Sequence, residues 1–264
     1  MKKTLVLVLA LLLVVAISAV SCAQVQQLVD QLPDEVVDKI PGVEKTKIPE
    51  GALKYWEDAS AGTAEVGADD ETLLPEELTI PKKSAGGNTV DTIGSYGFED
   101  CTNLKKVTIP DSVEKIKSGA FWGCTNLTEV TMEDLVAEIQ SGAFKNCSSL
   151  TTVKLSANIN RIAADTFEGC TSLTSISLPD PVVEIGSAAF DGCTALTEIS
   201  LPAALYYIGA NAFIGTSLTS ITFRGTMDQW AGVSLETLLS DCPNLTVTCA
   251  DGAVYHYVGG TCVD

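Results

Sequence analysis

The most regular feature of the chain is an interval of 23 residues between equivalent apolar positions. Phenylalanine, isoleucine and cysteine all keep this interval, and a leucine follows each of the cysteines by three residues. The positions are Phe98, Phe121, Phe144, Phe167, Phe190 and Phe213; Ile93, Ile116, Ile139, Ile162, Ile185 and Ile208; and Cys101, Cys124, Cys147, Cys170 and Cys193. A fixed period of this length predicts a solenoid, in which each coil buries its apolar side against its neighbours.

Each repeat contains one short stretch in which apolar and polar residues alternate. In 173–179, Ile176 and Leu178 are apolar, whereas Ser175 and Ser177 are polar. This alternation predicts a strand that directs the apolar side chains inward and the serines outward. The rest of each repeat must return the chain to the next strand. The predicted fold is therefore a β-rich solenoid with a parallel sheet on one face and turns, irregular or 3-10 segments on the other.

The repeats are expected over 78–223, in about six coils, with a C-terminal cap over 224–264. The sixth copy, 211–218, has one residue fewer than the others and lacks the cysteine, with Thr216 near the missing position. Upstream, 78–81 has the pattern of a strand end, but its connection to Ile93 is six residues longer than in the next repeat.

The repeat can be written L-x-x-[IV]-x-[LIMF]-P, followed by [IV]-x-x-I-x-x-x-[AT]-F-x-x-C-x-x-L. This pattern resembles the bacterial leucine-rich repeat family of the BspA type. The segment 223–230 and the later 248–252 resemble the capping segment that often follows such repeats. The resemblance implies a leucine-rich repeat solenoid in an exported or surface protein, some members acting as adhesins toward host matrix or other cells. It implies no catalytic residues.

The N-terminus has the pattern of an export signal. Lys2 and Lys3 precede thirteen consecutive apolar residues, 5–17, which are too few to span a bilayer. Small residues ending in Cys22 resemble a bacterial lipobox, so we expect a signal peptide over 1–22 and lipidation of Cys22. Cleavage after Ala23 and a retained anchor are the alternatives. The first two routes predict a protein outside the cytoplasm, either an envelope or surface lipoprotein or a secreted protein.

Residues 23–77 differ in composition from the repeats. They contain 14 acidic and 4 basic residues and four prolines. The stretch 58–71 is small, polar and acidic, and such sequences bury too little apolar area to offset the entropy of ordering. We therefore expect an acidic, partly disordered spacer or stalk. The alternative, an acidic cation-binding loop, lacks the residue pattern of a calcium hand.

Charge and motifs limit the possible functions. The formal net charge is −18, which disfavours nucleic acid as a partner. The single histidine, His256, leaves little material for a catalytic dyad or a histidine metal centre. The sequence contains no G-x-S-x-G, H-E-x-x-H or P-loop motif. We expect a protein that is not an enzyme and has no cofactor or metal.

The nine cysteines fall into groups. The five that share the 23-residue interval are expected to be buried free thiols, because parallel side chains on successive coils suit a disulfide poorly. Cys242, Cys249 and Cys262 lie near the end. With His256 they could form a zinc site, but their spacings do not match the usual zinc knuckle. The remaining interpretations are a Cys249–Cys262 disulfide and unpaired thiols.

The strand register also gives the outward positions, which form the candidate binding face. Eight of the twelve are serine or threonine, and two lysines balance two glutamates. They are Lys106, Thr108, Glu129, Thr131, Thr152, Lys154, Ser175, Ser177, Glu198, Ser200, Ser220 and Thr222. The face is either a solvated hydroxyl ladder that keeps the sheet soluble or a docking surface for a protein or glycan.

The sequence gives different predictions for two of the tryptophans. Trp122 occupies a position that is polar in most other repeats, so it is either an exposed interface residue or a cover over the neighbouring coil. Trp230 lies in the capping segment and is expected to pack in the core.

Together these features predict an adhesin-like surface binding protein whose ligand is a protein or glycan, held at the membrane through a lipid on Cys22. A structural or assembly role within the envelope, on the periplasmic side, is the alternative.

Overall fold

The computed structural model describes residues 48–263, and Glu50–Asp264 forms one compact unit. The expected signal peptide, Cys22 and residues 23–47 of the expected spacer lie outside the described residues. No helix in the described part of the chain is long and apolar enough to cross a membrane.

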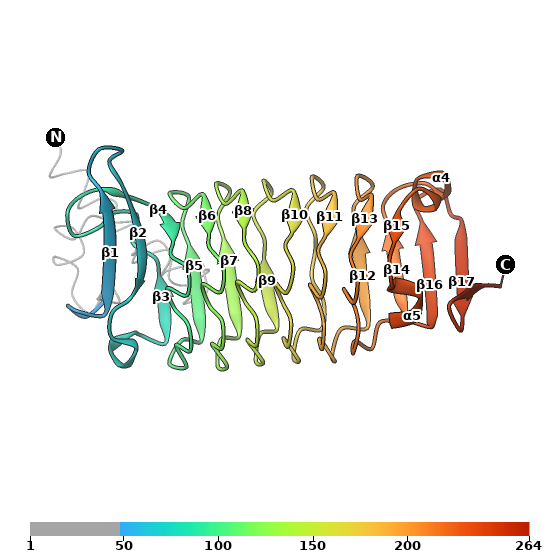
Figure 1. Ribbon diagram of the computed structural model, residues 1–264, viewed down its shortest axis with the longest axis horizontal. Coiled ribbons are helices and arrows are strands. Elements are labelled where there is room, and N and C mark those ends of the chain that lie inside the picture. The colour runs from blue at the N-terminus through green and yellow to red at the C-terminus, as the bar shows by residue number, and fades with distance from the viewer. Residues whose placement is uncertain (1–47, 264) are drawn as a thin grey trace, which may run out of the picture. The chain divides into compact units, whose positions relative to one another are not determined.

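One side of the solenoid, the strand face, is built of parallel strands that each belong to a different coil (Figure 1). The coil between β9 and β12 contributes an isolated parallel bridge, from Ser177 to Ser200 of β12. The strands are β3 (Glu77–Thr79), β5 (Lys106–Ile109), β7 (Glu129–Met132), β9 (Thr152–Lys154), β12 (Glu198–Leu201), β14 (Ser220–Phe223) and β16 (Asn244–Cys249). This arrangement confirms the predicted parallel sheet.

The opposite side, the second face, is also a stack of parallel strands, most only two residues long. Their isoleucines pair from coil to coil. The residue after an isoleucine donates its backbone N–H to the isoleucine of the preceding coil, as the Gln140 N–H does to the Ile116 carbonyl at 2.9 Å. The strands are β2 (Thr63–Ala68), β4 (Thr89–Ile93), β6 (Lys115–Ile116), β8 (Glu138–Ile139), β10 (Arg161–Ile162), β11 (Glu184–Ile185), β13 (Tyr207–Ile208) and β15 (Ser234–Leu235). The second face is thus more regular than the expected turns, because the 23-residue period aligns backbone groups as well as side chains.

The registers show where coils gain or lose residues. Glu77 pairs with Lys106, so the first coil has the longer connection expected from the sequence. Glu198 pairs with Ser220, an offset one residue shorter than the usual interval. Ser220 pairs with Thr246, because the last coil contains an added helix.

The core is a column of phenylalanine rings. Neighbouring rings from Phe98 to Phe213 have centroids 5.2–5.7 Å apart and planes within 14° of parallel. All six side chains are fully buried. Stacking at this separation adds to the stabilisation from burial alone.

One turn in every coil requires left-handed backbone. Six positions at the repeat interval have φ between 53° and 65°. The residues are Tyr96, Gly119, Gly142, Asp165, Ala188 and Asn211. Glycine, aspartate and asparagine tolerate this conformation, whereas Tyr96 and Ala188 adopt it at a cost.

Regular elements occupy much of residues 50–77, where the sequence predicts an acidic, partly disordered spacer. β1 (Leu53–Asp58) and β2 form an antiparallel hairpin, β2 pairs in parallel with β4, and a 3-10 helix η1 (Glu71–Leu73) leads into β3. Ala64 and Val66 are buried against the first coil. The segment folds although it contains few large apolar residues, because it needs to cover only the open end of an existing core.

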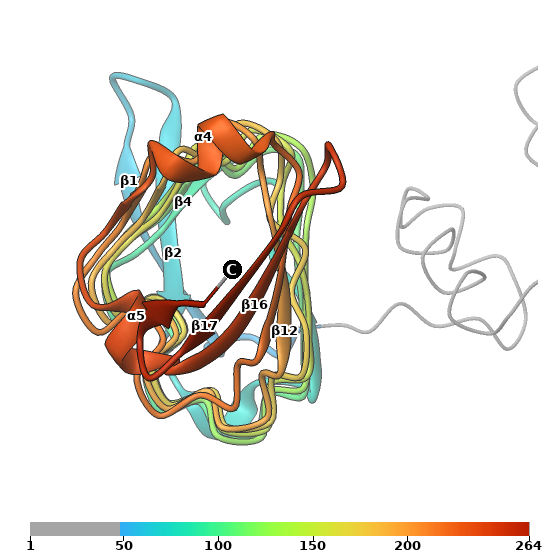
Figure 2. The same cartoon turned by 90° about the vertical axis from the view of Figure 1, so that its right-hand side faces the viewer.

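The C-terminal segment continues both faces before it closes them. α4 (Met227–Ala231) begins with a capping box between Thr226 and Gln229, and α5 (Leu238–Asp241) follows β15. After β16, the chain adds two antiparallel strands, β17 (Val254–Val258) and β18 (Thr261–Cys262), over the end of the strand face (Figure 2).

Trp230 packs in the core of this segment, as expected. Its side chain is 2% exposed, its ring lies 5.3 Å from that of Phe223, and its indole Nε1 donates to the Tyr257 hydroxyl at 3.2 Å.

Candidate binding surface

The strand face carries the twelve outward residues on its solvent side. They are exposed or half-exposed, whereas the residues between them, such as Val107, Val130 and Ile199, are buried. The twelve are Lys106, Thr108, Glu129, Thr131, Thr152, Lys154, Ser175, Ser177, Glu198, Ser200, Ser220 and Thr222. Because the coils stack in register, these side chains form rows that run along the solenoid.

Charges on the strand face are partly neutralised within it. The Lys106 ammonium lies 3.6 Å from a Glu129 carboxylate oxygen and 3.8 Å from Glu77. Lys154 and Glu198 form no ion pair with any described residue. The face therefore offers hydroxyl groups and two free charges of opposite sign to a ligand.

Trp122 is half-buried and has close neighbours in both adjoining coils. Its ring centroid lies 6.1 Å from that of Tyr96, and the Lys145 ammonium lies 5.1 Å over the ring. Lys145 is held in turn by Glu168 at 2.6 Å. Of the two alternatives for Trp122, these contacts favour the cover over the neighbouring coil.

The more exposed aromatic residue of this cluster, Tyr96, was missed from the sequence. Its side chain is 49% exposed, and its ring lies against Gly119, where an added Cβ would come within 2.4 Å of the ring. The signal that could have found it is its position, since a tyrosine occupies a turn that requires positive φ.

The repeated cysteines are buried free thiols, as expected. Each sulfur from the second rung onward donates to the backbone carbonyl of a phenylalanine in the preceding coil, as Cys147 does to Phe121 at 3.1 Å. Burial raises the pKa of the Cys147 and Cys170 thiols well above the usual range and that of Cys193 to about 12. These thiols are structural groups in their neutral form.

Cys242 belongs to the same row rather than to a tail cluster. Its sulfur lies 3.9 Å from the Thr216 hydroxyl, which occupies the preceding rung. Burial raises its pKa to about 11. The sequence concealed this position because the last coil is longer than the repeat interval.

Of the two interpretations of Cys249 and Cys262, a disulfide and unpaired thiols, the structure supports the second. Both are free thiols: Cys249 ends β16, whereas Cys262 lies opposite Tyr257, which pairs with Leu245 at the other end of β16. Four residues of strand, about 13 Å, and an intervening strand separate them, beyond the reach of a disulfide. The described residues contain no group of three or more potential ligands arranged for a metal.

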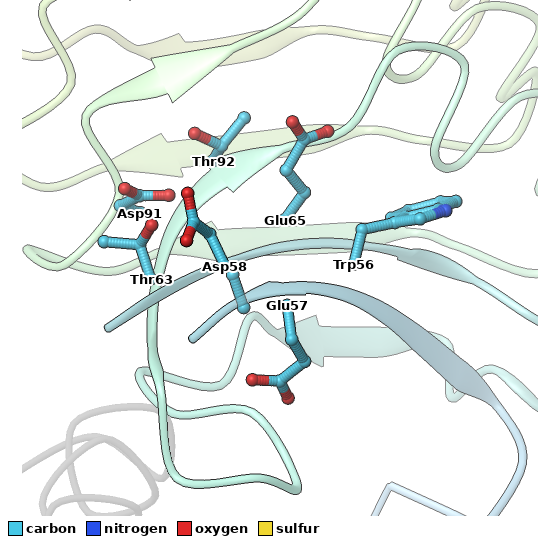
Figure 3. A pocket seen from close by; sticks show the side chains of 8 residues that line it. Trp56, Glu57, Asp58, Thr63, Glu65, Asp91 and Thr92 are labelled. Atoms are coloured by element: carbon cyan, nitrogen blue, oxygen red, sulfur yellow. The ribbon is translucent and has the colours of Figure 1, made fainter. Parts of the chain in front are cut away.

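A hollow lies away from the strand face, beside β1 and β2 (Figure 3). Its volume is about 240 Å³, and its lining includes Trp56, Asp58, Glu65 and Asp91. Two of these carboxylates already have protein partners: Asp58 accepts hydrogen bonds from Ser60 and Ala61, and Glu65 pairs with Lys117. The hollow is small for a drug-sized ligand.

Comparison with known proteins agrees with the repeat geometry. A family model for the BspA type leucine-rich repeat region, in six copies, matches residues 76–182 and 114–236. No curated protein matches significantly. A leucine-rich repeat protein of T. pallidum has 27% identity and a TM-score of 0.61, over 67% of this chain and 86% of that chain.

Two other solved structures are similar to part of this chain. A leucine-rich repeat protein from Eubacterium ventriosum ATCC 27560 has 27% identity and a TM-score of 0.49, over 58% of this chain and 48% of that chain. A leucine rich cell surface protein from Faecalibacterium prausnitzii A2-165 has 18% identity and a TM-score of 0.41, over 70% and 97%. Since the family model spans more than half of the chain and its copies coincide with the stacked coils, the protein belongs to the BspA-type leucine-rich repeat family.

Proposed function

We propose that the protein is a non-catalytic recognition protein outside the cytoplasm, and that its strand face binds an extended protein or glycan. The observation that carries the proposal is the continuous row of outward hydroxyl and charged side chains over β5, β7, β9, β12 and β14. A flat face of this kind suits a ligand that contacts several coils at once.

The position of the two hollows described, away from the strand face, favours an extended ligand. These two hollows have volumes of about 240 and 180 Å³ and lie at the two ends, beside Trp56 and Trp230. Enclosed sites for small molecules are usually larger, about 300–1,000 Å³. Binding would therefore depend on hydrogen bonds from the hydroxyl rows and on the free charges of Lys154 and Glu198.

The proposed location rests on the N-terminal sequence. The basic residues, the apolar run and Cys22 favour export and lipidation. A diacylated cysteine would anchor the chain stably, because two acyl chains bind a membrane far more strongly than one.

Binding is tested with the full chain on host cells, extracellular matrix and neighbouring bacteria. The face variant replaces Thr152 and Ser175, both exposed at the centre of the strand face, with arginine. The control replaces Ala157 and Asn160, which are exposed outside the strand face, with arginine as well. We expect the face variant to bind at least about tenfold more weakly and the control to bind normally. Equal binding by both variants would place the ligand elsewhere.

Protease treatment of intact cells tests the location. Loss of the repeat domain, followed by antibody while periplasmic markers survive, is the expected result. Protection until the envelope is broken would contradict surface recognition. It would support the structural role on the periplasmic side.

A further inference from the structure

The N-terminal end of the second face finishes in a strand with an open edge. β1 pairs with β2 on one side, and its other side has no strand partner among the described residues (Figure 1). β1 is six residues long, whereas β18, which ends the strand face at the other end, has two. Natural sheets usually shorten or cover their edges, so a long open edge is a site for another strand.

The backbone groups on this edge can be assigned from the hairpin. The Asp69 N–H donates to the Ala52 carbonyl, so the pair formed by these two residues is hydrogen-bonded. Because antiparallel pairs alternate, Leu53, Tyr55 and Glu57 direct their N–H and C=O groups away from β2. No backbone hydrogen bond within the described chain reaches these groups from outside the hairpin.

The exposed side chains of β1 alternate in a self-complementary order. Lys54, Trp56 and Asp58 share one side of the strand, since each is two residues from the next. All three are exposed, Trp56 by 48%. The order is therefore cation, aromatic ring, anion, with the ring at the centre.

We propose that β1 pairs antiparallel with β1 of a second copy of the chain, about a two-fold axis at Trp56. In this register, Lys54 lies opposite the partner's Asp58 on both sides of the axis, and Trp56 lies opposite the partner's Trp56. Tyr55 and the partner's Glu57 form the hydrogen-bonded pairs that use the open backbone groups. Charge complementarity selects a second copy as the occupant, because an antiparallel copy reverses the order of the cation and the anion.

The pairing has a consequence for recognition. The axis is perpendicular to the sheet, so the second faces of the two copies become one continuous sheet. Both strand faces then lie on the same side of the dimer. Two ligand-binding faces with a common orientation increase avidity for a repetitive surface. This consequence rests on the proposed function, whereas the dimer itself does not.

Charge reversal tests the register in the full chain, by sedimentation velocity in detergent over a series of concentrations. Lys54→Asp and Asp58→Lys should each weaken the dimer about tenfold, because each puts two like-charged pairs opposite one another. The double variant, Lys54→Asp with Asp58→Lys, should restore it to within about twofold. Lys154→Asp is the control and should leave dimerisation unchanged. A monomer at every concentration, or a double variant as weak as the single ones, would overturn the proposal.

A disulfide test locates the axis independently of affinity. Residues directly opposite in a non-hydrogen-bonded pair have Cβ atoms about 4.5–5.5 Å apart, close enough for a disulfide after small adjustment. Trp56→Cys should form a covalent dimer under mild oxidation in a background without Cys22 and Cys262. Lys54→Cys should not, because its copy lies four residues away along the strand. Equal cross-linking of both variants would contradict the register.

Discussion

The central coils and the N-terminal hairpin cover the same apolar core with different side chains. In the centre, Phe144 stacks on a phenylalanine of each neighbouring coil, at 5.4 and 5.7 Å. In the hairpin, Ala64 and Val66 close the end of the core, and Gly67 lies against Gly97 so closely that an added Cβ would be 2.8 Å from its carbonyl oxygen. The centre is filled by large rings, whereas the end is closed by close backbone approach.

This contrast shows which features of a solenoid can be recognised in its sequence. A coil between two coils repeats its neighbours' side chains, because each position meets its own equivalent. An end coil has a neighbour on one side only, so its packing depends on contacts that occur once in the chain. The same holds at the C-terminus, where Trp230 and Tyr257 form a contact with no counterpart in the repeats.

Alkaline pH should weaken the coils that carry the buried cysteines. Burial raises the pKa of Cys101, Cys147, Cys170, Cys193 and Cys242, the last two to about 12 and about 11. The unfolded chain releases these protons above its ordinary thiol pKa of about 8.5, while the folded chain keeps them. Stability is therefore full below that pH and falls as pH rises, by about 1.4 kcal/mol per thiol for each pH unit until the folded pKa is reached.

Thermal unfolding at neutral and alkaline pH measures this loss. A variant with Cys147→Ala and Cys170→Ala should lose less stability between the two conditions than the natural chain. Thiol labelling at neutral pH gives a second readout, since exposed Cys262 should react rapidly and the buried row only on unfolding. Rapid labelling of Cys147 in the folded chain would contradict the assignment.

Phe144→Ala should destabilise the centre by about 3–5 kcal/mol, because the cavity opens between two stacked rings. Denaturant unfolding followed by circular dichroism measures the change. Phe213→Ala is the matched variant: that ring stacks on Phe190 on one side and faces the cap on the other, where the less regular coil can adjust. An equal loss at both positions would mean that the ends pack as rigidly as the centre.

Val66→Ala tests whether the N-terminal hairpin belongs to the folded unit. Val66 is fully buried, so removing two methyl groups should cost about 2 kcal/mol. Proteolysis of the hairpin should accelerate together with the loss of global stability. Tyr206→Ala is a control, because its side chain is 57% exposed. An unchanged melting curve for Val66→Ala would mean that residues 50–77 are a spacer and not part of the folded unit.

The structure of a coil could be predicted from the sequence because the same pattern of buried and exposed positions recurs in every repeat. Ile176 and Leu178 are buried and Ser175 and Ser177 are exposed, as their alternation indicates. The sequence did not predict the hairpin, because the low apolar content of 58–71 gives no sign that a ready-made core lies beside it. Cys242 was misplaced for a related reason: helix α4 lengthens the last coil and breaks the interval by which the other rungs were found.

Pairwise contacts were also beyond the sequence. Trp122 lies on a turn, and its exposure depends on Tyr96 and Lys145, which lie in two different coils. The repeat determines the backbone position of a side chain, whereas the residues that differ between coils determine what that side chain contacts.

The smallest expected effect concerns a position where the repeat itself is strained. Ala188 has φ 54° at a turn where two other coils use glycine, and left-handed backbone costs an L-residue about 1–2 kcal/mol. Ala188→Gly removes this cost, while the extra freedom of glycine in the unfolded chain offsets about 0.5–1 kcal/mol. We expect a net gain of about 0.5 kcal/mol and a small rise in melting temperature, measured by calorimetry. Ala189→Gly, one residue along and buried, should instead destabilise, because it removes a packed methyl group and gains no relief of strain. A loss of stability in both variants would mean that the central coils hold Ala188 without strain, and that regularity there depends on side-chain stacking alone.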